Sequence, residues 1–158
     1  MKITILTVGK LKEKYLVEGI KEYSKRLSKY TKLEFIEVND EHAPENLSEK
    51  DMLNIKDKEA DKILGKLKDS YVVSLALEGK KMTSEKLAQK IEDIKTYHNS
   101  HITFIIGGSL GLSQKIFKKS NYLLSFSDMT FPHQLMKLIL LEQIYRSFRI
   151  NNNEPYHK

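Results

Sequence analysis

Short apolar runs alternate along this chain with longer stretches in which apolar residues recur every three or four positions. The apolar runs are residues 3–8, 33–38, 71–77, 102–106 and 122–126. Such runs predict buried strands, and the wider spacing predicts amphipathic helices. The elements alternate strand and helix five times, which predicts an α/β fold: a mainly parallel five-stranded sheet with helices on both faces.

Local signals set several boundaries. The alternation in 33–38 is weak, which predicts a strand near a sheet edge. Ser48 offers a hydroxyl cap to a helix whose next residues include Glu49 and Asp51. Residues 78–81 are predicted to form the turn leaving the third strand. Pro132 suits the first turn of a last helix that continues to about Ile150.

The last predicted helix is apolar on more than one side. Apolar residues cover one arc and extend around the cylinder; they are Leu135, Met136, Leu138, Ile139, Leu140, Leu141, Ile144, Tyr145 and Phe148. One sheet cannot cover so wide a surface. Either the helix is central to one compact core, or a second copy of the chain packs against it, as in a homodimer.

Two loops leave the fourth and fifth strands on the same side of the predicted sheet. The first, Gly107 to Gly111, holds three of the seven glycines. The second, Ser127 to His133, brings hydroxyls, a carboxylate and an imidazole to a helix start. Ligands of parallel sheets bind beyond the carboxyl ends of the strands, so we expect the ligand site where these loops meet.

The glycine loop leaves several interpretations open. It lacks the Gly-x-Gly-x-x-Gly spacing of dinucleotide folds, and no phosphate-binding Gly-Lys-Ser/Thr loop exists, which disfavours a dehydrogenase or an NTPase. Asp128 follows the next strand, where an acidic residue could bind a ribose. A nucleoside-type ligand and a plain tight turn therefore both remain.

Composition narrows the class of protein. The chain has 158 residues, no cysteine and a net charge of +6 from 27 Lys+Arg against 21 Asp+Glu. These values suit a single domain, residues 1–158, that is cytoplasmic and able to meet a polyanion, although a lysine-rich solvated surface explains the charge equally well. No run is long enough to span a membrane, and the five histidines show no metal-ligand spacing.

The end of the chain offers a second group of candidates. Arg146 lies four residues after Glu142 in the last helix, where a salt bridge is the simple interpretation. The terminal Tyr156 and His157 form either a frayed tail or a group suited to contact a nucleobase by stacking and hydrogen bonding.

Taken together, several of these segments carry a resemblance across the whole length. They are Val8-Gly9-Lys10, Gly79-Lys80, Ile106-Gly107-Gly108 with Gly111-Leu112, Ser125 to His133, Glu142 to Arg146, and Tyr156-His157-Lys158. The chain resembles the RlmH (YbeA) family of SPOUT-class methyltransferases. That resemblance implies a C-terminal deep trefoil knot, a homodimer, and methylation of N3 of a pseudouridine in 23S ribosomal RNA, within the large subunit or the whole ribosome.

The resemblance also implies S-adenosylmethionine as cofactor and assigns site residues. The implied cofactor-binding residues are Leu75, Gly107, Phe126, Ser127, Asp128, Met129, Thr130 and Phe131. Because Arg146, Tyr156 and His157 share RNA-compatible chemistry, we also hypothesise that the neighbouring subunit supplies them to complete the site, as positioning or proton-transfer residues. Rival hypotheses are an α/β nucleotide-binding protein and a ribosome-associated RNA-binding factor without methyl transfer.

Overall fold

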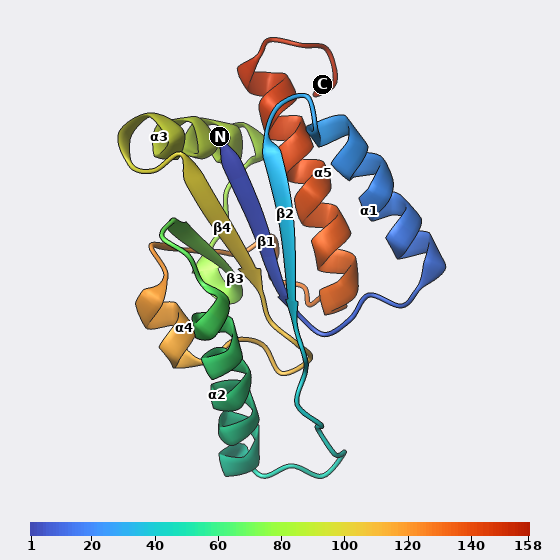
Figure 1. Ribbon diagram of the computed structural model, residues 1–158, viewed down its shortest axis with the longest axis vertical. Helices are drawn as coiled ribbons and strands as arrows, with labels where there is room; N and C mark the ends of the chain where they lie inside the picture. The colour runs from blue at the N-terminus through green and yellow to red at the C-terminus, as the bar shows by residue number, and fades with distance from the viewer.

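The computed structural model describes all residues from Met1 to Lys158 and contains a five-stranded, fully parallel sheet (Figure 1). The strands are β1 (Lys2–Val8), β2 (Lys32–Val38), β3 (Tyr71–Lys80), β4 (His101–Ile106) and β5 (Tyr122–Leu124). Their order is β2-β1-β4-β3-β5. The predicted element order and the edge position of 33–38 are both confirmed.

Helices cover both faces of the sheet. They are α1 (Lys14–Leu27), α2 (Glu49–Lys66), α3 (Ser84–Tyr97), α4 (Gln114–Lys119) and α5 (His133–Asn151). Alternate residues of each strand point to opposite faces, so Ile3 and Ile5 join the core under α1, α3 and α5, whereas Leu6 and Val8 join the core under α2 and α4. Two cores therefore hold the sheet between two helical layers.

Helix α2 begins as its sequence predicts. The Ser48 hydroxyl accepts a hydrogen bond from the Asp51 backbone N–H at 3.1 Å, and the Asp51 carboxylate accepts from the Ser48 N–H at 3.4 Å. This capping box satisfies two donors that the first turn would leave free.

The end of β3 differs from the prediction. Instead of turning at 78–81, the strand continues to Lys80, and its pairing with β5 shifts register between Leu75 and Lys80. A Cβ at Gly79 would lie 2.7 Å from the backbone carbon of Leu123. Gly79 therefore marks a close approach of two backbones rather than a turn.

The last helix packs between two others. Figure 1 shows α5 lying alongside α1 and near α3, and both helices contact it. Leu140, Leu141 and Ile144 are fully buried within the chain. This explains much of the apolar surface that the sequence placed around the helix, while Leu135 and Ile139 stay partly exposed. Pro132 is the residue before the helix, one position earlier than predicted.

Candidate functional site

A cavity of about 690 Å³ lies at the carboxyl edge of the sheet. Four segments form most of its wall: residues 75–78 of β3, residues 106–112 at the end of β4, residues 124–127 at the end of β5, and residues 129–133 leading into α5. Lys56, Phe117 and Met136 complete it. The volume falls in the range of small-molecule sites. Both loops that the sequence assigned to a ligand site thus line one cavity.

The glycine turn is tightly folded. The Gly111 N–H donates to the Gly108 carbonyl at 3.0 Å, and Gly111 has a φ of +85° that side-chain-bearing residues rarely adopt. A Cβ at Gly107 would lie 2.8 Å from the backbone carbon of Gly111. The turn closes on itself because position 107 has no side chain.

Helix α2 supports this turn from behind. The Ser113 hydroxyl, just after the turn, donates to the Asp57 carboxylate at 2.5 Å. The Glu59 carboxylate is 5% exposed, lies beside Gly108, and accepts a hydrogen bond from the Glu41 backbone N–H at 3.0 Å. Burial raises the pKa of this carboxyl above its ordinary value. Two acidic side chains of α2 thus flank the turn.

The second loop is held by its own hydroxyls. Ser125 donates to the Ser127 carbonyl at 3.0 Å, and the Ser127 hydroxyl accepts from the Met129 N–H at 3.0 Å. These bonds direct the following residues along the cavity mouth, where Met129 is 72% exposed.

Seven of the eight residues assigned to cofactor binding line the cavity. They are Leu75, Gly107, Phe126, Ser127, Met129, Thr130 and Phe131. Asp128 does not line it: its side chain is 83% exposed and forms an ion pair with Lys81 at 2.7 Å. The ribose interpretation of Asp128 therefore has no support from its position.

The cavity wall contains one charged residue that sequence reasoning did not select. Lys56 of α2 is the one lysine or arginine on the wall, and it forms no ion pair within the chain. Glu78, near the end of β3, and His133, whose imidazole the sequence placed in the second loop, also line the cavity. Nothing in the spacing of α2 separates Lys56 from its many charged neighbours. Its position depends on how α2 packs beside the glycine turn, which the sequence does not specify.

The terminal candidates form a hydrogen-bonded cluster on α5. Arg146 donates to the Glu142 carboxylate at 3.0 and 2.6 Å and lies 2.9 Å from the Nδ1 atom of His157. The Tyr156 hydroxyl donates to the same carboxylate at 3.0 Å, and its ring lies 4.8 Å from the Arg146 guanidinium. The structure therefore brings together all three residues and confirms the salt bridge with Glu142.

The pKa shifts of the clustered side chains follow from these contacts. The hydrogen bond from Arg146 to Glu142 raises the pKa of the guanidinium further, and burial, together with Tyr23 and Glu142, raises the pKa of the Tyr156 phenol. The other ring nitrogen of His157 lies 2.6 Å from Glu85, whose pKa this contact lowers. Both phenol and guanidinium stay protonated at neutral pH.

The cluster lies apart from the cavity. None of its residues lines the cavity wall, and Figure 1 shows the tail folded over the far end of α5. Met136 is the last residue of α5 on the cavity wall and lies 10 residues before Arg146, so about 15 Å of helix separates them. Within one chain, the cavity-lining residues and the cluster of Arg146, Tyr156 and His157 therefore form two separate sites.

Two classes of site lack support in the structure. No group of three or more His, Cys, Asp or Glu side chains is placed to hold a metal ion. No helix is long and apolar enough to cross a membrane.

Comparison with known proteins adds independent information. The family model described as predicted SPOUT methyltransferase matches residues 1–157. The chain is 63% identical to the ribosomal RNA large subunit methyltransferase H of Clostridioides difficile (strain 630), and each chain is covered completely. It is 62% identical to the protein of the same name from Shouchella clausii (strain KSM-K16), again over the full length of both.

Solved structures share the fold at low sequence identity. A probable methylase family protein from Haemophilus influenzae Rd KW20 has a TM-score of 0.55 at 14% identity, covering 99% of this chain and 70% of that one. The tRNA (m1G37) methyltransferase from Aquifex aeolicus has a TM-score of 0.50 at 16% identity, covering 92% and 70%. At such identities the likeness concerns the fold alone.

Proposed function

Since this chain belongs to the SPOUT methyltransferase family and matches ribosomal RNA large subunit methyltransferases H over its full length, we propose that it methylates 23S ribosomal RNA with S-adenosylmethionine as methyl donor. The observation that carries this proposal is the cavity at the strand exits. Its two loops are among the segments that bear the family resemblance, and they lie at the edge where parallel sheets bind ligands.

The residues present fit a nucleoside. Apolar side chains of Leu75, Phe126, Met129 and Phe131 line the cavity and can enclose an adenine ring. The turn at Gly107 brings backbone close to the cavity without a side chain, so its N–H and C=O groups can hold the edge of the base and the ribose. We assign Ser127, Thr130 and the backbone of Asp128 to the same binding loop.

The charged wall residues suit the other end of the cofactor. S-adenosylmethionine carries an α-carboxylate and an α-ammonium group, besides the sulfonium that supplies an electrophilic methyl group when bound. Lys56 and Glu78 are charges of opposite sign on the same cavity wall. We assign Lys56 to the carboxylate because the lysine has no ion-pair partner within the chain.

Catalysis then depends mainly on positioning. Methyl transfer to a nitrogen is an in-line displacement, so the enzyme gains most by holding donor and acceptor in line. If the acceptor is N3 of a pseudouridine, that nitrogen must also lose a proton. The Arg146, Tyr156 and His157 cluster offers a ring to stack, a cation for phosphate or a developing negative charge, and an imidazole to receive or orient the proton.

A homodimer would bring the cavity of one chain and the tail cluster of the other together. Within one chain, about 15 Å of α5 separates Arg146 from Met136, the last residue of this helix on the cavity wall, so we infer that a second copy presents its tail across the cavity of the first. The partly exposed Leu135 and Ile139 of α5 provide apolar surface for such a contact. Sedimentation velocity should give twice the monomer mass; a monomer that is fully active would contradict this assembly.

We further propose that residues 1–158 form a single SPOUT domain with a C-terminal trefoil knot, and that the protein acts in the cytoplasm on large subunits or whole ribosomes. The close passage of β3 against β5 at Gly79 agrees with a chain that threads tightly in this region. The described residues form one sheet with its covering helices, so we expect recognition to depend on the folded RNA itself, and assembled ribosomes should be methylated far faster than naked RNA oligonucleotides.

Calorimetric titration tests the cofactor assignment directly. The account predicts saturable binding of S-adenosylmethionine and S-adenosylhomocysteine, with no binding of NAD or FMN at the same concentrations. Binding of NAD or FMN instead would favour an α/β nucleotide-binding protein of another class. Binding of ribosomes with none of these small molecules would favour an RNA-binding factor without methyl transfer.

A further inference from the structure

The connection between β1 and α1, together with the first two residues of α1, carries a basic and aromatic surface beside the cavity. Its sequence, Lys10-Leu11-Lys12-Glu13-Lys14-Tyr15, places three lysines within five residues and a tyrosine next to them. Lys10, Lys12, Lys14 and Tyr15 are all exposed, and Tyr15 is 68% exposed. We call residues 10–15 the entry segment. None of its residues lines the cavity or belongs to the tail cluster.

The entry segment is held against the start of α5. The Gln134 side-chain amide donates to the Lys10 carbonyl at 2.9 Å, and Leu11 packs against the core under α1 and α5. A Cβ at Gly9 would lie 3.8 Å from the imidazole of His133, which lines the cavity. Because Leu11 points inward, its neighbouring lysines point outward from a fixed backbone next to the cavity mouth.

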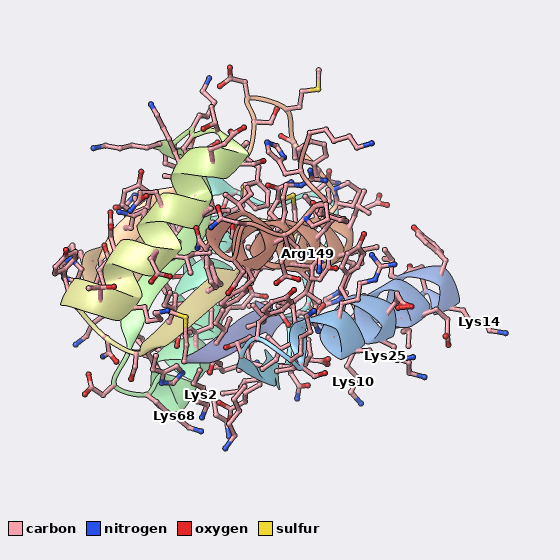
Figure 2. The ribbon with its side chains drawn as sticks, turned by 90° about the horizontal axis from the view of Figure 1, so that it is seen from above. Lys2, Lys10, Lys14, Lys25, Lys68 and Arg149 are labelled. Carbon is pink, nitrogen blue, oxygen red and sulfur yellow. The ribbon has the colours of Figure 1, made fainter.

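The entry segment carries three lysines against a single carboxylate, that of Glu13. Lys10, Lys12 and Lys14 form no ion pair within the chain. By contrast, Lys2 and Lys68 both pair with Glu34. Figure 2 shows Lys14 projecting outward at the end of α1, far from Lys2 and Lys68. Lys14 also lies in the first turn of α1, which has no acidic residue, although the helix dipole disfavours a cation there.

Tyr15 has no aromatic partner. The rings of Tyr23, Tyr30 and Tyr145 pack against one another or Phe148, whereas the Tyr15 side chain makes no ring contact and its hydroxyl makes no hydrogen bond within the chain. A large exposed ring among cations that form no ion pair is the composition with which proteins bind unpaired nucleotides: the cations contact phosphates and the ring stacks on a base.

We propose that the entry segment binds the ribosomal RNA strand that flanks the methylated nucleotide. Lys10, Lys12 and Lys14 contact successive phosphates, and Tyr15 stacks on an unpaired base near the one entering the cavity. This inference rests on the proposed function, and it adds a surface on the cofactor-binding subunit to the tail supplied by the partner. The RNA is then held from both sides of the cavity mouth.

The test is a triple variant, Lys10→Ala, Lys12→Ala, Lys14→Ala, with unmodified ribosomes as substrate. Each phosphate contact to a single strand contributes about 0.7 to the slope of log affinity against log salt, so loss of three should lower that slope by about 2. At physiological salt we expect the KM for ribosomes to rise roughly 10- to 50-fold. Affinity for S-adenosylhomocysteine should not change.

A second triple variant removes the same charge elsewhere. Lys25 in the last turn of α1, Lys32 at the start of β2 and Lys66 at the end of α2 are exposed and form no ion pair. They lie towards the amino ends of the strands, opposite the carboxyl edge that holds the cavity. Their replacement by alanine should leave KM and the salt slope within about twofold of wild type. Equal effects from both triple variants would mean that only net charge matters, and would overturn the proposal.

Tyr15 provides a charge-neutral arm of the test. Tyr15→Phe keeps the ring and should keep the wild-type KM, whereas Tyr15→Ala should raise KM roughly fivefold or more through lost stacking. If wild-type protein methylates ribosomes but the entry-segment variants match it, this inference fails alone. If wild-type protein neither binds S-adenosylhomocysteine nor methylates ribosomes, the proposed function fails with it.

Discussion

Replacement of Gly107 by alanine should distort the cavity through steric overlap alone. The φ of Gly107 is not in the left-handed region, so backbone strain is not the cause. The added Cβ would lie 2.8 and 2.9 Å from the backbone carbon and oxygen of Gly111, and 3.0 Å from the Leu112 side chain. Two of these three contacts are to backbone, so the turn itself must move to admit the methyl group.

The size of the effect follows from overpacking. Forcing a methyl group into a filled site costs about 1–3 kcal/mol of the free energy of unfolding. For a domain of this length, that corresponds to a Tm lower by about 2–12 °C. Because the displaced turn lines the cavity, we also expect affinity for S-adenosylhomocysteine to fall at least about tenfold, or ~1.4 kcal/mol.

Gly65→Ala is the matched control. Gly65 lies in α2, and a Cβ there meets nothing within 4 Å. The same chemical change should therefore stabilise the protein by about 0.4–1 kcal/mol through the unfolded state and leave binding unchanged. Thermal unfolding and calorimetric titration of both variants measure the two effects. A Gly107→Ala protein with wild-type Tm and wild-type affinity would refute the assignment of the turn.

Three further predictions concern charged groups. Lys56→Met should lower affinity for S-adenosylhomocysteine about tenfold but leave affinity for 5′-methylthioadenosine, which lacks the carboxylate, unchanged. Calorimetric titration of both ligands tests this prediction, with Lys58→Met as the control. Equal losses of affinity for the two ligands would contradict the assignment of Lys56 to the carboxylate. His157→Ala should lower kcat on ribosomes by about 10²-fold or more if the imidazole handles the proton, with cofactor affinity unaffected; full turnover would remove His157 from the site. Hydrogen bonds from Lys2, Lys68 and Thr4 lower the pKa of Glu34 from 4.5 to about 2. The ionised carboxylate therefore stabilises the fold above pH 4.5, and this stabilisation is lost as the pH falls towards 2. Urea unfolding should show a smaller acid-induced loss in the free energy of unfolding for Glu34→Gln than for wild type, and parallel plots of that free energy against pH would refute the linkage.

Much of the architecture was predictable from local pattern. Strong β-branched runs such as residues 102–106 are buried on both faces, and the weaker run of β2 lies at the edge. Ser48 caps α2 because its hydroxyl and the Asp51 carboxylate act within one turn. Such features depend on neighbours in the sequence, so the sequence alone determines them.

The remaining features depend on contacts between distant segments. Gly79 has the sequence appearance of a turn, but it serves the close approach of β3 to β5. The placement of Lys56 on the cavity wall follows from the packing of α2 beside the glycine turn. Likewise, Tyr156 and His157 reach Glu142 and Glu85 on two different helices. No periodicity in the chain encodes these distances.

The candidate site was predictable in part for the same reason. The topology of a parallel sheet places strand exits at one edge, so the loops at Gly107 and Ser127 had to lie near each other. The orientation of single side chains did not follow. Asp128 lies in the right loop, yet it points outward to Lys81.

Transfer of a radiolabelled methyl group from S-adenosylmethionine to ribosomes lacking this modification tests the central claim most directly. The account predicts stoichiometric label in 23S ribosomal RNA with wild-type protein, located at a pseudouridine by nuclease mapping, and strongly reduced label with Gly107→Ala. Absence of label under conditions where wild-type protein binds both the cofactor and the ribosome would contradict the account.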